Sequence, residues 1–209
     1  MDGFFNPEGS VMRALSRVAD LAILNVLWLV CSIPVVTMGA STTAFYSISM
    51  KMVRDEESYI IRGFFKAFKE NFKDSTLFWV GCMIIFAVLG GDFYIFSHWD
   101  SQWKYPMLVL LLVAFIVFVF MYLYLFPLIA KFKNSKSQYL KNAFFMSIRH
   151  LPYSIVLMVV FGCEIYANIY ILENIETYLP LGILFGFSLF AYAKSWIMMK
   201  VFKPYLGEE

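Results

Sequence analysis

The chain has 209 residues, of which 61% are hydrophobic and 20% aromatic, and its formal net charge is +2. An ordinary soluble domain is about 45 to 50% apolar, so the composition excludes a soluble globular protein and indicates one that resides in a membrane. The small net charge provides no basic field for nucleic acid, and we expect no nucleic-acid partner.

The first predicted element is a helical hairpin within the segment Leu21–Met50, which contains no Asp, Glu, Lys or Arg. A bilayer core about 30 Å thick requires roughly 20 apolar residues in a helix, so this segment holds at least one span. Pro34 and Gly39 lie five positions apart within the segment and favour a turn. We predict two helical arms, at 14–33 and 38–53.

A charged loop follows the hairpin, and its second half, 59–72, places phenylalanines at helical spacing with lysines elsewhere on the helix. This pattern is typical of an amphipathic helix that lies in the membrane interface or docks on a partner protein. The basic residues of the loop favour the cytoplasmic side. The predicted partner or lipid surface comprises Phe64, Phe68, Lys66 and Lys69, together with Lys136 and Lys141 further along the chain.

Four further spans are predicted at 76–96, 106–130, 153–172 and 179–199. Lys131–Arg149, between the second and third of these, carries five basic residues and no acids. This is the strongest cytoplasmic signal in the chain. We therefore expect residues 1–209 to form a single transmembrane domain.

Two topologies fit these spans, and they differ in the first hairpin. With six spans both termini are cytoplasmic, whereas with five the N-terminus is outside and the early basic residues lie on the wrong side. We favour six, so the predicted fold is an all-α, polytopic transmembrane bundle of six helices, with five as the alternative. The arm 38–53 is short and polar for a lipid-facing span, and we expect its neighbours to shield it. A weak repeat supports the hairpin, since Lys51 and Tyr59 recur eighty residues later as Lys131 and Tyr139.

Three polar residues inside the predicted spans form the candidate intramembrane polar site: Glu164, Asn168 and Lys194. Ionisable groups in a membrane are costly and are candidates for function. The functional interpretation is a proton or substrate site, and the alternative is a hydrogen bond between packed helices. We expect Lys194 to reach the headgroups from the inner end of its span. Since Glu164 and Lys194 differ in depth by roughly 10 Å, they can pair only if a helix shifts or breaks.

No motif of a catalytic, cofactor or metal site occurs in the sequence. The three cysteines each lie alone in an apolar run, and there is no phosphate-binding loop and no G-x-S-x-G nucleophile motif. We therefore expect a protein that is not an enzyme and that holds no cofactor and no metal.

Four segments carry a resemblance to a known family. They are FFNPEGSVMRALSRVADLAILNVLWLVCSIPVVTMGASTTAFYSISMKMVRDEE, FKAFKENFKDST, LYLFPLIAKFKNS and LKNAFFMSIRHLP. Together they resemble the YesL-like family of bacterial integral membrane proteins, whose function is unknown. Members occur mainly in Gram-positive bacteria, and their genes often lie beside genes for carbohydrate ABC transporters and polysaccharide degradation. The resemblance therefore implies a location in the cell membrane and a link to carbohydrate uptake, and it carries no established site residues.

Three functions follow from these observations. The first is a non-enzymatic accessory protein that works with the permease of a sugar ABC transporter through the basic segments 59–72 and 139–150. The second is a small-molecule transporter or channel subunit with Glu164 and Asn168 at an intramembrane polar site. The third is a structural or lipid-sensing protein that binds anionic lipid through its lysines. In each case the bilayer is a partner, and the sequence leaves the oligomeric state open.

Overall fold

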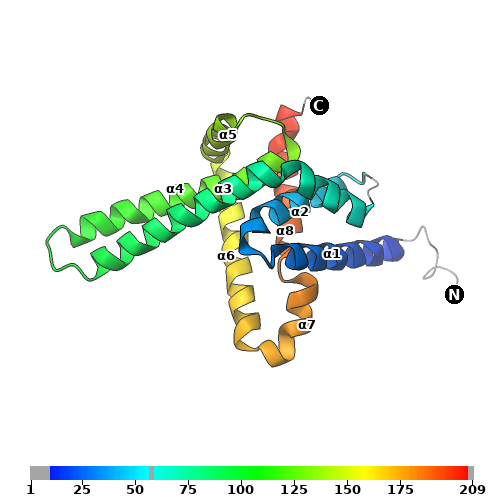
Figure 1. The fold of residues 1–209 in the computed structure, drawn as a ribbon, viewed down its shortest axis with the longest axis horizontal. Coiled ribbons are helices and arrows are strands. Elements are labelled where there is room, and N and C mark those ends of the chain that lie inside the picture. The colour runs from blue at the N-terminus through cyan, green and yellow to red at the C-terminus, as the bar shows by residue number, and fades with distance from the viewer. Residues whose placement is uncertain (1–9, 57–58, 207–209) are drawn as a thin grey trace.

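The computed structural model describes residues 10–56 and 59–206, and these residues form helices and no strands (Figure 1). The α-helices are α1 (Ser10–Ser32), α2 (Met38–Val53), α3 (Ile60–Ser97), α4 (Lys104–Lys131), α5 (Lys136–Arg149), α6 (Leu151–Glu173), α7 (Ile175–Phe185) and α8 (Ser188–Phe202). Two short 3₁₀ helices, η1 (Val35–Thr37) and η2 (Lys203–Tyr205), follow α1 and α8. The predicted all-α class is confirmed.

Within residues 10–56 and 59–206, five helical segments are long and apolar enough to cross a membrane, which indicates a multi-pass membrane protein. They are Met12–Ser32, Ile60–Ser97, Lys104–Lys131, Leu151–Glu173 and Ile175–Tyr205. By length and composition this is the five-span alternative. The span that distinguishes the six-span prediction, 38–53, coincides with α2, which has only 16 residues.

α2 is the buried centre of the fold. Of its 16 residues 12 are buried, and α1, α3, α4 and α8 pack around it. Hydroxyl groups that would be costly in lipid find partners on these neighbours: Trp28 donates to Thr42 over 3.1 Å, and Ser75 donates to Thr43 over 2.8 Å. At Gly39 a Cβ would lie 2.5 Å from the carbonyl oxygen of Ser75, so α2 and α3 approach closely. As expected, neighbouring helices shield this arm.

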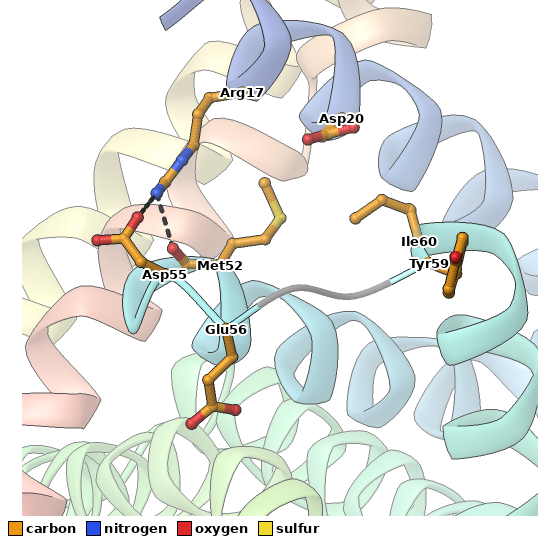
Figure 2. Close-up of a pocket in the computed structure, with 7 residues that line it drawn as sticks. All are labelled: Arg17, Asp20, Met52, Asp55, Glu56, Tyr59 and Ile60. Carbon is orange, nitrogen blue, oxygen red and sulfur yellow. Dashed lines mark hydrogen bonds and ion pairs between the residues drawn. The ribbon is translucent and has the colours of Figure 1, made fainter. Parts of the chain in front are cut away.

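The two arms of the predicted hairpin are antiparallel, and a charged contact joins their ends (Figure 2). Arg17, near the start of α1, donates to the carbonyl oxygen of Met52 over 2.7 Å and pairs with the carboxylate of Asp55. The guanidinium thereby lies against the partial negative charge at the C-terminal end of α2. Because the start of α1 and the end of α2 lie together, the chain leaves α2 on the side where α1 began. α2 therefore returns the chain to that side as a buried helix, and it is not one of the five candidate spans.

α3 is one continuous helix of 38 residues, so the predicted separate interfacial helix at 59–72 is wrong. At 1.5 Å per residue it is about 57 Å long, well beyond a bilayer core of about 30 Å. The ring of Trp79 packs on Phe126 of α4. α4 ends five residues later at Lys131, whereas α3 extends from Trp79 back to Ile60. The first turns of α3 therefore continue past the end of α4.

The long α3–α4 hairpin and the α6–α7 hairpin point in different directions from the common centre at α2 and α8 (Figure 1). The molecule is therefore a set of diverging hairpins around a packed centre, and its spans are not all parallel. The two tyrosines of the predicted repeat also differ, since Tyr139 is 3% exposed and Tyr59 is 83% exposed. Their surroundings give the repeat no support.

Candidate functional site

The last predicted span, 179–199, is broken, and the break forms the candidate site. α7 ends at Phe185 and α8 begins at Ser188. Asn25 of α1 fills the gap: its Oδ1 accepts from the backbone N–H groups of Phe187 (3.1 Å) and Ser188 (2.9 Å). Its Nδ2 donates to the carbonyl oxygen of Ile183 over 2.6 Å. The amide of Asn25 thus replaces hydrogen bonds that an unbroken helix would make, as irregular backbone within a membrane protein requires.

A second asparagine supports the break from the other side. Asn168 of α6 donates to the carbonyl oxygens of Glu164 (2.8 Å) and Gly186 (3.1 Å). A Cβ at Gly186 would lie 2.6 Å from the carbonyl oxygen of Gly182, so the conformation leaves no room for a side chain there. Of the three predicted polar-site residues, Asn168 therefore holds the helix break.

The break places the ring of Phe187 against α1 and α2. Its ring stacks on Trp28 with centroids 4.1 Å apart and an interplanar angle of 7°. It also meets Phe45 of α2 edge to face, with centroids 5.0 Å apart. Aromatic pairs of this kind contribute stability beyond that of burying their surface. The ring contacts of Phe187 therefore stabilise the break in addition to its hydrogen bonds.

Glu164 and Lys194 form a buried ion pair. Nζ of Lys194 donates to Oε2 of Glu164 over 2.6 Å. Lys194 is 4% exposed and Glu164 is 6% exposed. The expectation that Lys194 reaches the headgroups is wrong. The condition for pairing, a shifted or broken helix, is met because α8 is separate from α7.

Aromatic rings enclose the cation of the pair. Nζ of Lys194 lies 5.4 Å from the ring centroid of Phe187 and 5.6 Å from that of Phe161, and such contacts stabilise a cation removed from water. A cavity of about 40 Å³ adjoins the pair. It is lined by Thr42, Tyr46, Tyr122, Leu123, Phe126, Phe161, Glu164, Phe187 and Lys194. The space suits water or a small ion.

α8 is attached to its neighbours on either side of Lys194. The hydroxyls of Ser195 and Ser49 of α2 are 2.5 Å apart. Tyr192 accepts a hydrogen bond of 3.0 Å from Arg17 of α1. Any change in the ion pair that moves α8 must therefore also act on the α1–α2 hairpin.

The comparisons with known proteins bear on the first part of this architecture. Residues 21–93 match the DUF624 family, described as a protein of unknown function. The DUF624 match begins within α1, covers α2 and includes most of α3, so it contains Asn25, while Glu164 and Lys194 lie outside it. No curated protein and no solved structure is significantly similar to the chain. The DUF624 match names no activity, and the resemblance to YesL-like proteins stays a prediction.

Only some residues of the predicted partner or lipid surface are exposed. Phe64 is fully buried, so its place on that surface is wrong, and Phe68 is half-buried. The four lysines of the set, Lys66, Lys69, Lys136 and Lys141, are exposed. Their exposure is what a docking surface needs, and their role stays a prediction.

Sequence reasoning missed Asn25 and Phe187, the two residues that define the break. The sequence did contain a signal for Asn25, since it is a polar amide within the uncharged segment Leu21–Met50. The structure shows that this amide is fully buried. Phe187 carried no signal, because an aromatic residue in an apolar span is ordinary. Within residues 10–56 and 59–206 no group of His, Cys, Asp and Glu side chains is arranged to hold a metal.

Proposed function

We propose that this chain is an integral membrane transport component that exchanges a proton or a small monovalent cation at the Glu164–Lys194 site. The observation that supports the proposal is the ion pair itself, two opposite charges buried at the break of a spanning segment. Charged groups at such depth are costly and are functional candidates by default. Transporters commonly place their ion sites at discontinuous helices.

The size of the cavity favours a small solute. Small-molecule sites usually measure about 300 to 1,000 Å³, whereas the cavity beside the pair measures about 40 Å³. A sugar does not fit there in this arrangement of the helices. A proton, a water molecule or a monovalent cation does.

The pair also provides a coupling mechanism. A proton or cation that neutralises Glu164 would leave Lys194 as an unpaired charge in an apolar environment, which costs several kcal/mol. In the proposed mechanism α8 then moves so that water reaches the ammonium group. Since Ser195 and Tyr192 attach α8 to α2 and α1, that movement would spread to the hairpin.

The test is ion flux in liposomes that contain the purified protein. A potassium gradient with valinomycin sets the membrane potential, and a trapped pH dye reports proton entry. Parallel vesicles that contain a sodium-sensitive dye report cation entry. Glu164→Gln should abolish the flux, while the matched control Glu173→Gln, an exposed acid at the end of the same helix, should leave it unchanged. Flux no faster than in empty vesicles, with both dyes, would contradict the proposal.

A second candidate function is the accessory role beside a carbohydrate ABC transporter. The favouring observation is that Lys66 and Lys69 lie on the turns of α3 that continue past α4, while Lys136 and Lys141 lie exposed on α5. These lysines suit an acidic protein surface or anionic headgroups. The link to sugars comes only from the resemblance to YesL-like proteins.

Co-purification of a permease from native membranes tests the accessory role. Phe64 is unsuitable for substitution in this test, because a polar residue at this buried position would damage the core. Ile61 and Phe65 are 54% and 41% exposed, and serine at both should reduce the permease yield severalfold. A protein that always purifies alone would contradict this role.

We further propose that both termini are cytoplasmic and that the protein resides in the cell membrane. Single cysteines at Val36, Gln102 and Ser135, in a variant without the native cysteines, test this orientation. Val36 is the probe in the turn between α1 and α2 because it is exposed, whereas any side chain at nearby Gly39 would clash with α3. Labelling of Ser135 from inside only, and of the other two from outside only, is expected. The opposite pattern would invert the topology.

A further inference from the structure

A second pocket, separate from the ion pair, lies where three candidate spans end. One span ends at Lys131, another begins at Leu151, and the last ends at Tyr205. Tyr205 contacts the α5–α6 junction, since its hydroxyl lies 3.1 Å from Nε2 of His150. Convergence of three span ends places this region at one face of the bilayer, at the level of the headgroups.

The pocket has an apolar wall and a polar rim. Its volume is about 290 Å³. The apolar wall consists of Leu128, Phe132, Phe145 and Met146. The rim consists of Asn134, Asn142, Arg149 and Tyr205. This combination suits a ligand that has a charged head and a hydrocarbon tail.

Internal hydrogen bonds fix the shape of the pocket before a ligand arrives. The hydroxyl of Tyr139 donates to the carbonyl oxygen of Phe132 over 2.7 Å and accepts from the backbone N–H of Asn134 over 3.1 Å. The guanidinium of Arg149 lies over the ring of Tyr205, 5.9 Å from its centroid. Since the loop and the arginine are already held, binding would order few additional groups.

The rim of the pocket carries side-chain donors that can bind an anion. Oδ1 of Asn142 accepts a hydrogen bond from Nε2 of Gln138 over 2.8 Å, and the NH₂ group of Asn142 donates to none of the described residues. Arg149 contributes a planar set of donors that matches phosphate oxygens. Arg149 is also the last of five basic residues in Lys131–Arg149, a segment that contains no acids.

We propose that this pocket binds the phosphate of an anionic membrane lipid, with Arg149 and Asn142 on the headgroup and Phe132 and Phe145 beside the acyl chain. The inference is independent of the proposed ion site, because the two sites share no lining residue. The charge of the rim selects anionic over zwitterionic lipid. The position at the span ends favours a lipid over a soluble phosphate.

Native mass spectrometry of the detergent-purified protein tests the proposal. Phosphatidylglycerol and phosphatidylcholine are added at equal concentrations, and inorganic phosphate is added as a competitor in a separate arm. We expect phosphatidylglycerol to bind at least tenfold more tightly than phosphatidylcholine and to resist competition by phosphate. Arg149→Gln should weaken phosphatidylglycerol binding about tenfold, because it removes a charge-assisted contact.

Two further variants keep the result interpretable. Asn142→Leu retains the charge of the rim and removes the NH₂ donor, and it should weaken phosphatidylglycerol binding about threefold. Lys104→Gln removes one positive charge at the opposite end of α4 and should leave binding unchanged. Equal binding of the two lipids, unchanged binding in folded Arg149→Gln, or an equal loss in Lys104→Gln would overturn the proposal. Displacement of the lipid by phosphate at equal affinity would reassign the pocket to a free phosphate and overturn the lipid assignment.

Discussion

Lys194 pairs with Glu164 because the chain breaks eight residues before the lysine, at Gly186. In a continuous helix the two charges would lie roughly 10 Å apart in depth, whereas Nζ and Oε2 are 2.6 Å apart in the structure. The break requires Asn25, whose amide bonds to both sides of it. A buried residue of α1 thus determines where a charge on α8 lies.

Asn25→Ala should destabilise the protein strongly. The substitution removes the donor to Ile183 and the acceptor for Phe187 and Ser188, which leaves buried backbone groups without partners. The expected loss is about 2 kcal/mol or more, measured as a lower melting temperature in detergent. Asn174→Ala is the control, because Asn174 is exposed and bonds only within its own turn. Similar melting temperatures for the two variants would argue against the role of Asn25.

Gly186→Ala should also destabilise the protein, by about 1 to 3 kcal/mol. Its Cβ would lie 2.6 Å from the carbonyl oxygen of Gly182 and 3.2 Å from Oδ1 of Asn168. Gly90→Ala provides a matched comparison, since nothing lies within 4 Å of a Cβ there. Gly90 lies inside α3, where replacing glycine by alanine should stabilise the helix slightly. The melting temperatures of the two variants should therefore shift in opposite directions. A higher melting temperature for Gly186→Ala would contradict the close contact at the break.

Neighbouring phenylalanines of α3 should respond very differently to truncation. Phe64 is fully buried and Phe65 is 41% exposed. Phe64→Ala should cost about 3 to 5 kcal/mol through the cavity it leaves, whereas Phe65→Ala should cost much less. Chemical unfolding in mixed micelles measures the difference. Equal losses would mean that the burial of this turn is misassigned.

The imidazole of His150 should titrate below the ordinary histidine range. Burial and the adjacent Arg149 guanidinium lower its pKa. A group whose pKa is lower in the folded state contributes stability above its unfolded pKa, and this contribution is lost as the pH falls through the folded value. Acidification should therefore lower the free energy of unfolding. Nitrogen NMR of histidine-labelled protein follows the titration, with His150→Gln to assign the signal; a pKa at or above the free value would contradict this.

Much of the helical architecture could be predicted from the sequence. The arm 38–53 coincides with α2, and the turn at Pro34 separates it from α1. Hydropathy and helix breakers act locally, so these boundaries can be predicted from the sequence. The continuity of α3 could not be predicted, because charged residues in a helix that leaves the membrane resemble those of a separate interfacial segment.

The candidate site could be predicted only in part. Glu164 and Lys194 stood out as charges in apolar spans, but their pairing depends on a contact between α1 and the α7–α8 break. Asn25 and Ile183 are far apart in the chain, and no local pattern links them. Likewise, helical spacing shows that Phe64 and Phe68 share a face, and only the packing shows that this face turns inward at Phe64.

A double-mutant cycle on the ion pair tests the central claim most directly. Glu164→Gln, Lys194→Gln and the double variant are compared with the wild type by thermal unfolding in one detergent. Each single change leaves one buried charge unpaired and should cost about 3 kcal/mol or more, whereas the double variant should cost much less than the sum. Additive losses, or single variants as stable as the wild type, would show that Glu164 and Lys194 do not form a buried pair.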